Sequence, residues 1–85
     1  MKFSMEDARK AGDVIGIDWG KYNLEQFMLG MNIELEHGTR DSETNVTDDD
    51  AVMTGKIAFA HLKELPDYYD RLKKMEEDIE KFWRT

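Results

Sequence analysis

The sequence is poor in residues that would constrain it covalently or break its helices. It has no cysteine and a single proline in 85 residues. The absence of cysteine excludes a disulfide framework, a thiolate metal site and a cysteine nucleophile, so stability must come from packing. No apolar run reaches the length of a membrane span, and the N-terminal stretch turns acidic by Glu6. We therefore expect a cytoplasmic protein, neither secreted nor inserted in a membrane.

Basic residues are also scarce. Twelve lysines and arginines stand against 19 acidic residues, giving a net charge of −7. Such a chain repels phosphate backbones and anionic headgroups, so we expect neither nucleic acid nor membrane as a partner. A hydrophobic fraction of 40% indicates a folded chain, and a length of 85 residues suits one hydrophobic core. The sequence predicts a single helical domain spanning residues 1–85.

Helix signals begin near the N-terminus. Ser4 and Asp7 have the spacing of a capping box, in which each side chain accepts a hydrogen bond from the backbone N–H of the other residue. The pattern continues to Ile15 and meets a stop signal at Gly16. A short first helix is predicted.

A second helix is predicted over residues 24–37. Asn23 is a favourable N-cap, and Gly38 marks the C-terminal end. Apolar residues recur at steps of three and four, which predicts that one face is buried. These residues are Leu24, Phe27, Met28, Met31 and Leu35.

A third helix is predicted over residues 48–65, with Thr47 as N-cap and three aspartates in its first turn. It is apolar around much of its circumference, which predicts a central position. Pro66 ends it and opens a fourth helix.

The fourth helix carries an apolar stripe with the spacing of a coiled-coil seam, suited to packing along the third helix or against a partner. The stripe comprises Tyr68, Leu72, Met75, Ile79 and Phe82. We predict an all-α fold, a compact bundle of four helices whose first helix is short and whose second to fourth helices form the core.

Both histidines lie three residues from a glutamate, which places each pair on one helical face. The pairs are Glu34 with His37 and His61 with Glu64. One interpretation is structural: His37 satisfies carbonyls at the end of its helix, while His61 is partly buried and bonds Glu34 or a tyrosine hydroxyl. The other is a metal site built from all four side chains, because Glu-x-x-His is a ligand spacing of di-iron bundles.

Several short strings resemble the signature of a small prokaryotic family of unknown function. They are ELEHG, TNVT followed by DD, TGKIA, AHL and PDYY, within residues 12–77. The resemblance implies no activity, substrate, cofactor or catalytic residue.

No catalytic apparatus is visible in the sequence, so we expect neither an enzyme nor a cofactor. Large apolar side chains exceed what so small a bundle buries easily, which predicts a protein-interaction or regulatory module. The predicted interaction surface comprises Tyr69, Phe82 and Trp83, with a second copy or an unknown protein as partner. The alternative function is metal binding through the Glu/His pairs.

Overall fold

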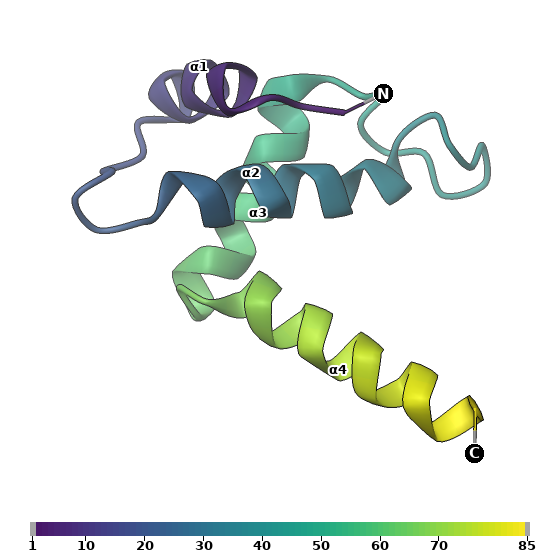
Figure 1. The fold of residues 1–85 in the computed structure, drawn as a ribbon. Coiled ribbons are helices and arrows are strands. Elements are labelled where there is room, and N and C mark those ends of the chain that lie inside the picture. The colour runs from purple at the N-terminus through teal and green to yellow at the C-terminus, as the bar shows by residue number, and fades with distance from the viewer. Residues whose placement is uncertain (1, 85) are drawn as a thin grey trace.

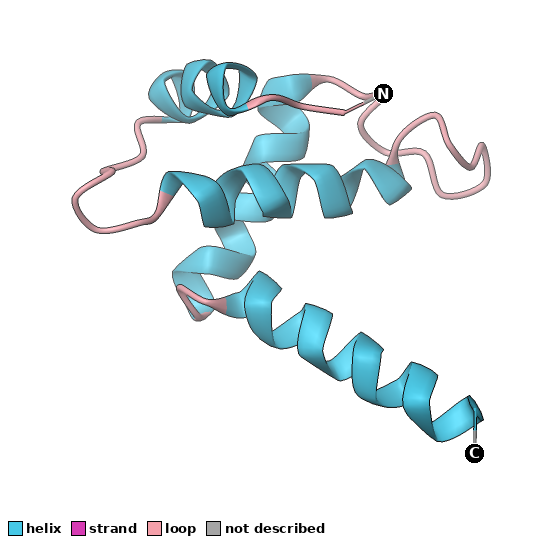
Figure 2. Ribbon diagram, viewed as in Figure 1, coloured by secondary structure: helices cyan, strands magenta, loops and turns pink. Residues whose placement is uncertain are grey.

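The computed structural model describes residues 2–84 and is all-α over that range, as predicted. Figures 1 and 2 show helices joined by loops. The helices are α1 (Met5–Ile15), α2 (Leu24–Glu34), the short 3-10 helix η1 (Leu35–His37), α3 (Ala51–Glu64) and α4 (Tyr68–Arg84).

The predicted limits of α1 are confirmed. The backbone N–H of Asp7 donates to Ser4 Oγ over 3.1 Å, and the Ser4 N–H donates to Asp7 Oδ2 over 2.9 Å. These reciprocal bonds satisfy two of the donors that a helix start leaves free. Gly16 ends the helix with a φ of 89°, a left-handed conformation that glycine adopts without steric cost.

The predicted helix at 24–37 has two parts. Its start is confirmed, because Asn23 Oδ1 accepts from the Gln26 N–H over 3.0 Å. After Glu34 the backbone tightens into η1, which ends before Gly38. In a 3-10 turn, side chains three residues apart eclipse one another, so Glu34 and His37 lie above one another on one face.

The predicted start of α3 is wrong. Thr47 is buried and precedes a tight turn in which Asp48 and Asp49 have positive φ angles of 50° and 63°. Aspartate tolerates this conformation better than most residues. Asp50 is the true N-cap and accepts from the Met53 N–H over 2.8 Å.

The core lies where α1 and α2 pack on α3, and α4 joins it at its first turns (Figure 1). Helices α2, α3 and α4 pack together, and α3 touches each of the other α-helices, which confirms its central position. Helix α1 also contributes to the core. The buried hydrophobic residues are Phe3, Ala8, Ala11, Ile17, Phe27, Met31, Ala58, Leu62 and Tyr69.

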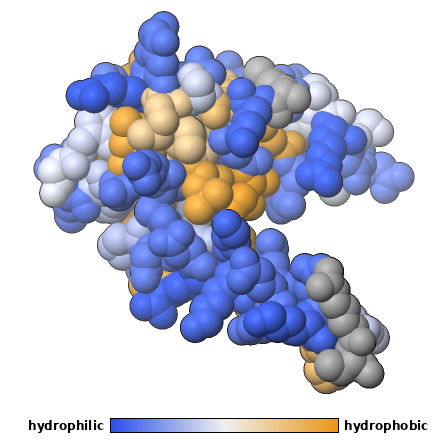
Figure 3. All heavy atoms as spheres, in the orientation of Figure 1, coloured by the Kyte–Doolittle hydropathy of each residue, from blue (hydrophilic) through white to orange (hydrophobic). Residues whose placement is uncertain are grey.

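Beyond Leu72, α4 leaves the other helices and points away from them (Figure 1). Its predicted seam therefore does not pack along α3 over its whole length: Met75, Ile79 and Phe82 are exposed. In the view of Figure 3 the visible side of α4 is largely hydrophilic, as expected for an amphipathic helix. No helix within residues 2–84 combines the length and apolarity needed to cross a membrane.

Candidate functional site

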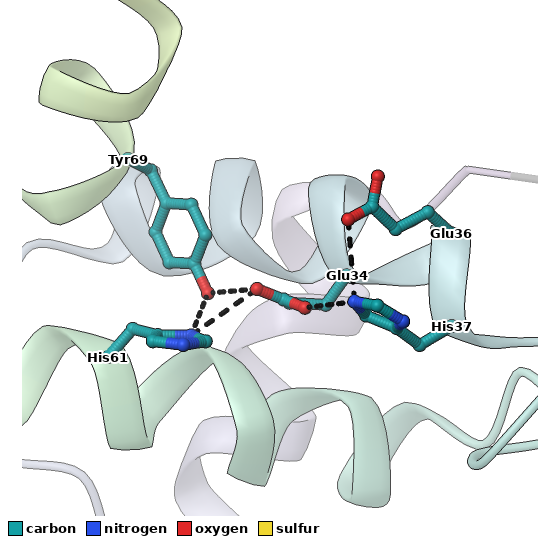
Figure 4. Close-up of polar contacts among 5 residues, drawn as sticks. All are labelled: Glu34, Glu36, His37, His61 and Tyr69. Carbon is teal, nitrogen blue, oxygen red and sulfur yellow. Dashed lines mark hydrogen bonds and ion pairs between the residues drawn. The ribbon is translucent and has the colours of Figure 1, made fainter. Parts of the chain in front are cut away.

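A buried carboxylate lies at the end of α2. Glu34 is 4% exposed, and a carboxylate so placed is costly unless polar partners surround it. Its Oε1 accepts a hydrogen bond of 2.9 Å from the Tyr69 hydroxyl, and His61 Nδ1 lies 3.3 Å from the same oxygen (Figure 4). The predicted contact between Glu34 and His61 is confirmed.

Tyr69 closes this arrangement into a triangle, because its hydroxyl oxygen is also 3.1 Å from His61 Nδ1. A phenol has one proton, and Tyr69 donates it to Glu34. A hydrogen bond between the hydroxyl and His61 then requires the imidazole tautomer that carries its hydrogen on Nδ1. Burial raises the pKa of Tyr69, and the hydrogen bond to Glu34 and its charge raise that pKa further. The tyrosine therefore remains a donor well into alkaline solution.

A glycine in α2 makes room for the tyrosine ring. A Cβ atom added to Gly30 would lie 2.3 Å from Cε2 of Tyr69, which is too close for any side chain. Tyr69 thus fills a notch in α2, and it is fully buried, so it lies outside the interaction surface predicted for it. The neighbouring Tyr68 stacks on the His61 ring with centroids 4.5 Å apart and planes 9° apart.

His37 approaches the cluster from η1. Its Nε2 lies 3.6 Å from Glu34 Oε2 and 3.4 Å from Glu36 Oε1 (Figure 4). The predicted role of His37 in capping carbonyls is therefore not what the structure shows, since the ring faces two carboxylates. Both histidines of the protein converge on the carboxylate of Glu34, one at each oxygen.

Three of the four residues in the predicted metal set come together. Glu34 contacts both His37 and His61, whereas Glu64 is exposed on α3 and makes no ion pair or hydrogen bond with them among the described residues. Glu36 replaces it. The alternation of ELEH gave no reason to prefer Glu36, because a regular helix puts residues two apart on different faces.

The arrangement combines hydrogen bonding with a potential for metal binding. On one side, Glu34 Oε1 holds the ends of α2, α3 and α4 together through Tyr69 and His61. On the other side, an imidazole nitrogen and two carboxylate oxygens lie within 4.8 Å of one another. The exposed residues Phe82 and Trp83 belong to a separate region, near the end of α4.

The chain belongs to a family described as a protein of unknown function, DUF5661, whose sequence model matches residues 8–78. The match includes the first half of α4 and the whole polar cluster, which comprises Glu34, Glu36, His37, His61 and Tyr69. It agrees with the resemblance to a small family of unknown function. No curated protein and no solved structure matches the chain.

Proposed function

We propose that the protein is an interaction module that pairs with a second copy of itself through the apolar face of α4. The observation that carries this proposal is the exposure of Met75 at 52%, Ile79 at 49% and Phe82 at 71%, all in one helical stripe. Apolar area exposed along a seam of this spacing is the part of a coiled-coil helix that a partner covers.

The stripe is continuous with the anchored part of the helix. Leu72 is half-buried against the core, and Met75, Ile79 and Phe82 follow it at steps of three and four. Covering apolar surface stabilises an assembly by about 25 cal/mol for each Å² removed from water. A short helix pair of this kind supports a reversible dimer rather than an obligate one.

The charges beside the stripe favour a second copy as the partner. Arg71 and Asp78 lie along one edge of the stripe, and Glu76 lies along the other. In a parallel pair of α4 helices Arg71 faces Glu76 of the other copy, and in an antiparallel pair it faces Asp78. Either direction joins opposite charges twice, once on each side of the symmetry axis.

Sedimentation of the whole chain over a wide range of concentration tests the proposal. We expect the mass to rise from monomer to dimer as the concentration increases. Ile79→Asp places a charge in the centre of the stripe and should hold the chain at the monomer mass. Lys73→Asp alters charge on the opposite face of α4 and serves as the matched control, which should still dimerise.

Two results would refute pairing through α4. One is a wild-type chain that stays monomeric at every concentration. The other is a dimer that Ile79→Asp leaves intact, because that dimer would use a different surface. A complex with another protein that forms while the chain itself stays monomeric would also overturn the choice of a second copy as partner.

A further inference from the structure

One oxygen of the buried carboxylate lacks a hydrogen bond. Glu34 Oε1 is held by Tyr69 and His61, whereas the ion-pair partner of Oε2 among the described residues is His37 Nε2 at 3.6 Å. That distance exceeds the 2.7–3.2 Å typical of an N–H···O bond. The Glu34 side chain is 5% exposed, so the protein fixes the position of its carboxylate. This oxygen thus faces the imidazole of His37 with no donor at hydrogen-bond distance among the described residues (Figure 4).

Two separations from His37 Nε2 are close to those between neighbouring ligand atoms of a metal ion. His37 Nε2 lies 3.6 Å from Glu34 Oε2 and 3.4 Å from Glu36 Oε1, and each of the three residues offers a ligand atom within 4.8 Å of the others. In a tetrahedral zinc site with bonds of about 2.0–2.1 Å, neighbouring ligand atoms are about 3.3–3.4 Å apart. One imidazole N–H cannot point at both oxygens in a straight line, whereas one cation can bind all three atoms.

We propose that Glu34, Glu36 and His37 bind a divalent transition-metal ion of the zinc class, with water completing the coordination. One imidazole nitrogen with two carboxylate oxygens is a donor set that suits zinc, and the two carboxylates balance the charge of the ion. Helix α2 and η1 supply all three ligands over four residues, because the 3-10 turn brings residues 34 and 37 together.

Tyr69 and His61 act on this site as positioning residues. Both contact Oε1 of Glu34, the oxygen that does not face His37, and so fix the orientation of the carboxylate. Such outer contacts commonly contribute 10–100-fold to metal affinity. His61 thereby has the structural role of the first interpretation, as a partner of Glu34, and not the ligand role of the alternative one. The site is independent of the proposed dimer.

A titration of the full chain with zinc chloride tests the site. The chain is first freed of metal with a chelator and exchanged into metal-free buffer at neutral pH. Calorimetry should give one zinc ion per chain, and NMR of the imidazole nitrogens should show a larger shift for Nε2 of His37 than for either nitrogen of His61. Glu36→Gln and His37→Gln should each weaken zinc binding at least tenfold.

The variants are chosen so that loss of folding does not imitate loss of binding. The Glu36 and His37 side chains are 54% and 43% exposed, so replacing them leaves the core intact. Glu64→Gln removes a carboxylate from the second Glu/His pair and is the matched control, with zinc affinity expected within twofold of the wild type. The proposal is overturned if either glutamine variant binds zinc as tightly as the wild type, or if the His37 signals do not move.

Discussion

The two halves of α4 have the same amphipathic pattern and different surroundings. In the first half, Tyr69 is fully buried and Leu72 is half-buried against the core. In the second half, Ile79 and Phe82 continue the stripe of Leu72 and are 49% and 71% exposed. The comparison teaches that helical periodicity identifies an apolar face, whereas the shape of the opposing surface determines whether that face is covered. The notch at Gly30 provides that shape for the first half only.

The largest expected effect comes from filling the notch. Gly30→Ala should displace Tyr69 and lower the free energy of unfolding by about 3 kcal/mol, as overpacking in a core does. The higher helix propensity of alanine, worth about 1 kcal/mol, opposes this loss without cancelling it. Urea unfolding followed by circular dichroism measures the difference.

Gly20→Ala is the control for that experiment. The added Cβ would lie 3.2 Å from Oδ1 of the Asp18 side chain, which can shift. Its effect should stay below about 1 kcal/mol. A Gly30→Ala chain as stable as the wild type would show that the ring of Tyr69 does not depend on the notch.

The second effect isolates the hydroxyl of Tyr69 from its ring. Tyr69→Phe keeps the packing and removes the donor to Glu34, so the unfolding free energy should fall by about 1–3 kcal/mol. Tyr68→Phe is a matched control one residue away, since no hydrogen bond of its hydroxyl is seen among the described residues. It should change stability by less than about 0.5 kcal/mol. Equal losses in the two variants would contradict the role given to the Tyr69 hydroxyl.

The third effect is a pH dependence of the stability that Tyr69 contributes in the first half of α4. The pKa of Tyr69 is raised above the ordinary value of 10.0, so its contribution to stability is fully present below that pH. Above pH 10 the tyrosine of the unfolded chain ionises first, which favours unfolding and lowers stability as the pH rises. The free energy of unfolding, measured at several pH values between 8 and 11, should therefore become more similar for the wild type and Tyr69→Phe as the pH rises. Parallel curves over that range would argue against a raised pKa.

The smallest effect on the free energy of unfolding is expected in the second, exposed half of α4. At concentrations where the chain is monomeric, Ile79→Asp should change the unfolding free energy by less than about 0.5 kcal/mol, because its side chain is already half in water. The same substitution is expected to abolish dimerisation. A large loss of stability in the dilute monomer would mean that the second half of α4 is packed within one chain.

Local interactions made much of the fold predictable. Ser4, Asn23 and Gly16 cap helices through contacts with residues close to them in the sequence. The ends of α1 and the start of α2 can therefore be predicted from a few neighbouring residues. The start of α3 does not follow in this way. The hydroxyl of Thr39 donates to Asp49 Oδ2 over 2.5 Å and its N–H donates to Oδ1 over 2.9 Å, which holds the loop in a turn. A contact across ten residues therefore makes Asp50 the cap.

The polar cluster was predictable only in part for the same reason. The spacing of the Glu/His pairs identified Glu34 and His61 as partners, because a half-buried histidine needs an acceptor. It could not show that Tyr69 would enter between them, since this requires both the turn at Pro66 and the missing side chain of Gly30. Glu36 was left out of the predicted metal set because the tighter turn of η1 changes which side chains meet.

The connection between α3 and α4 is short, so the packing of two adjacent aromatic rings, Tyr68 and Tyr69, sets the direction of α4. Tyr69 fills the notch at Gly30 and Tyr68 stacks on the His61 ring, while α4 continues to Arg84. At 1.5 Å per residue, Phe82 is about 20 Å from Tyr69. A tilt of the α4 axis by about 10° at Tyr69 therefore moves Phe82 by about 3.5 Å. A sub-ångström change in the packing of Tyr69 is therefore amplified along α4. The resulting displacement near Phe82 is comparable to the width of a methyl group.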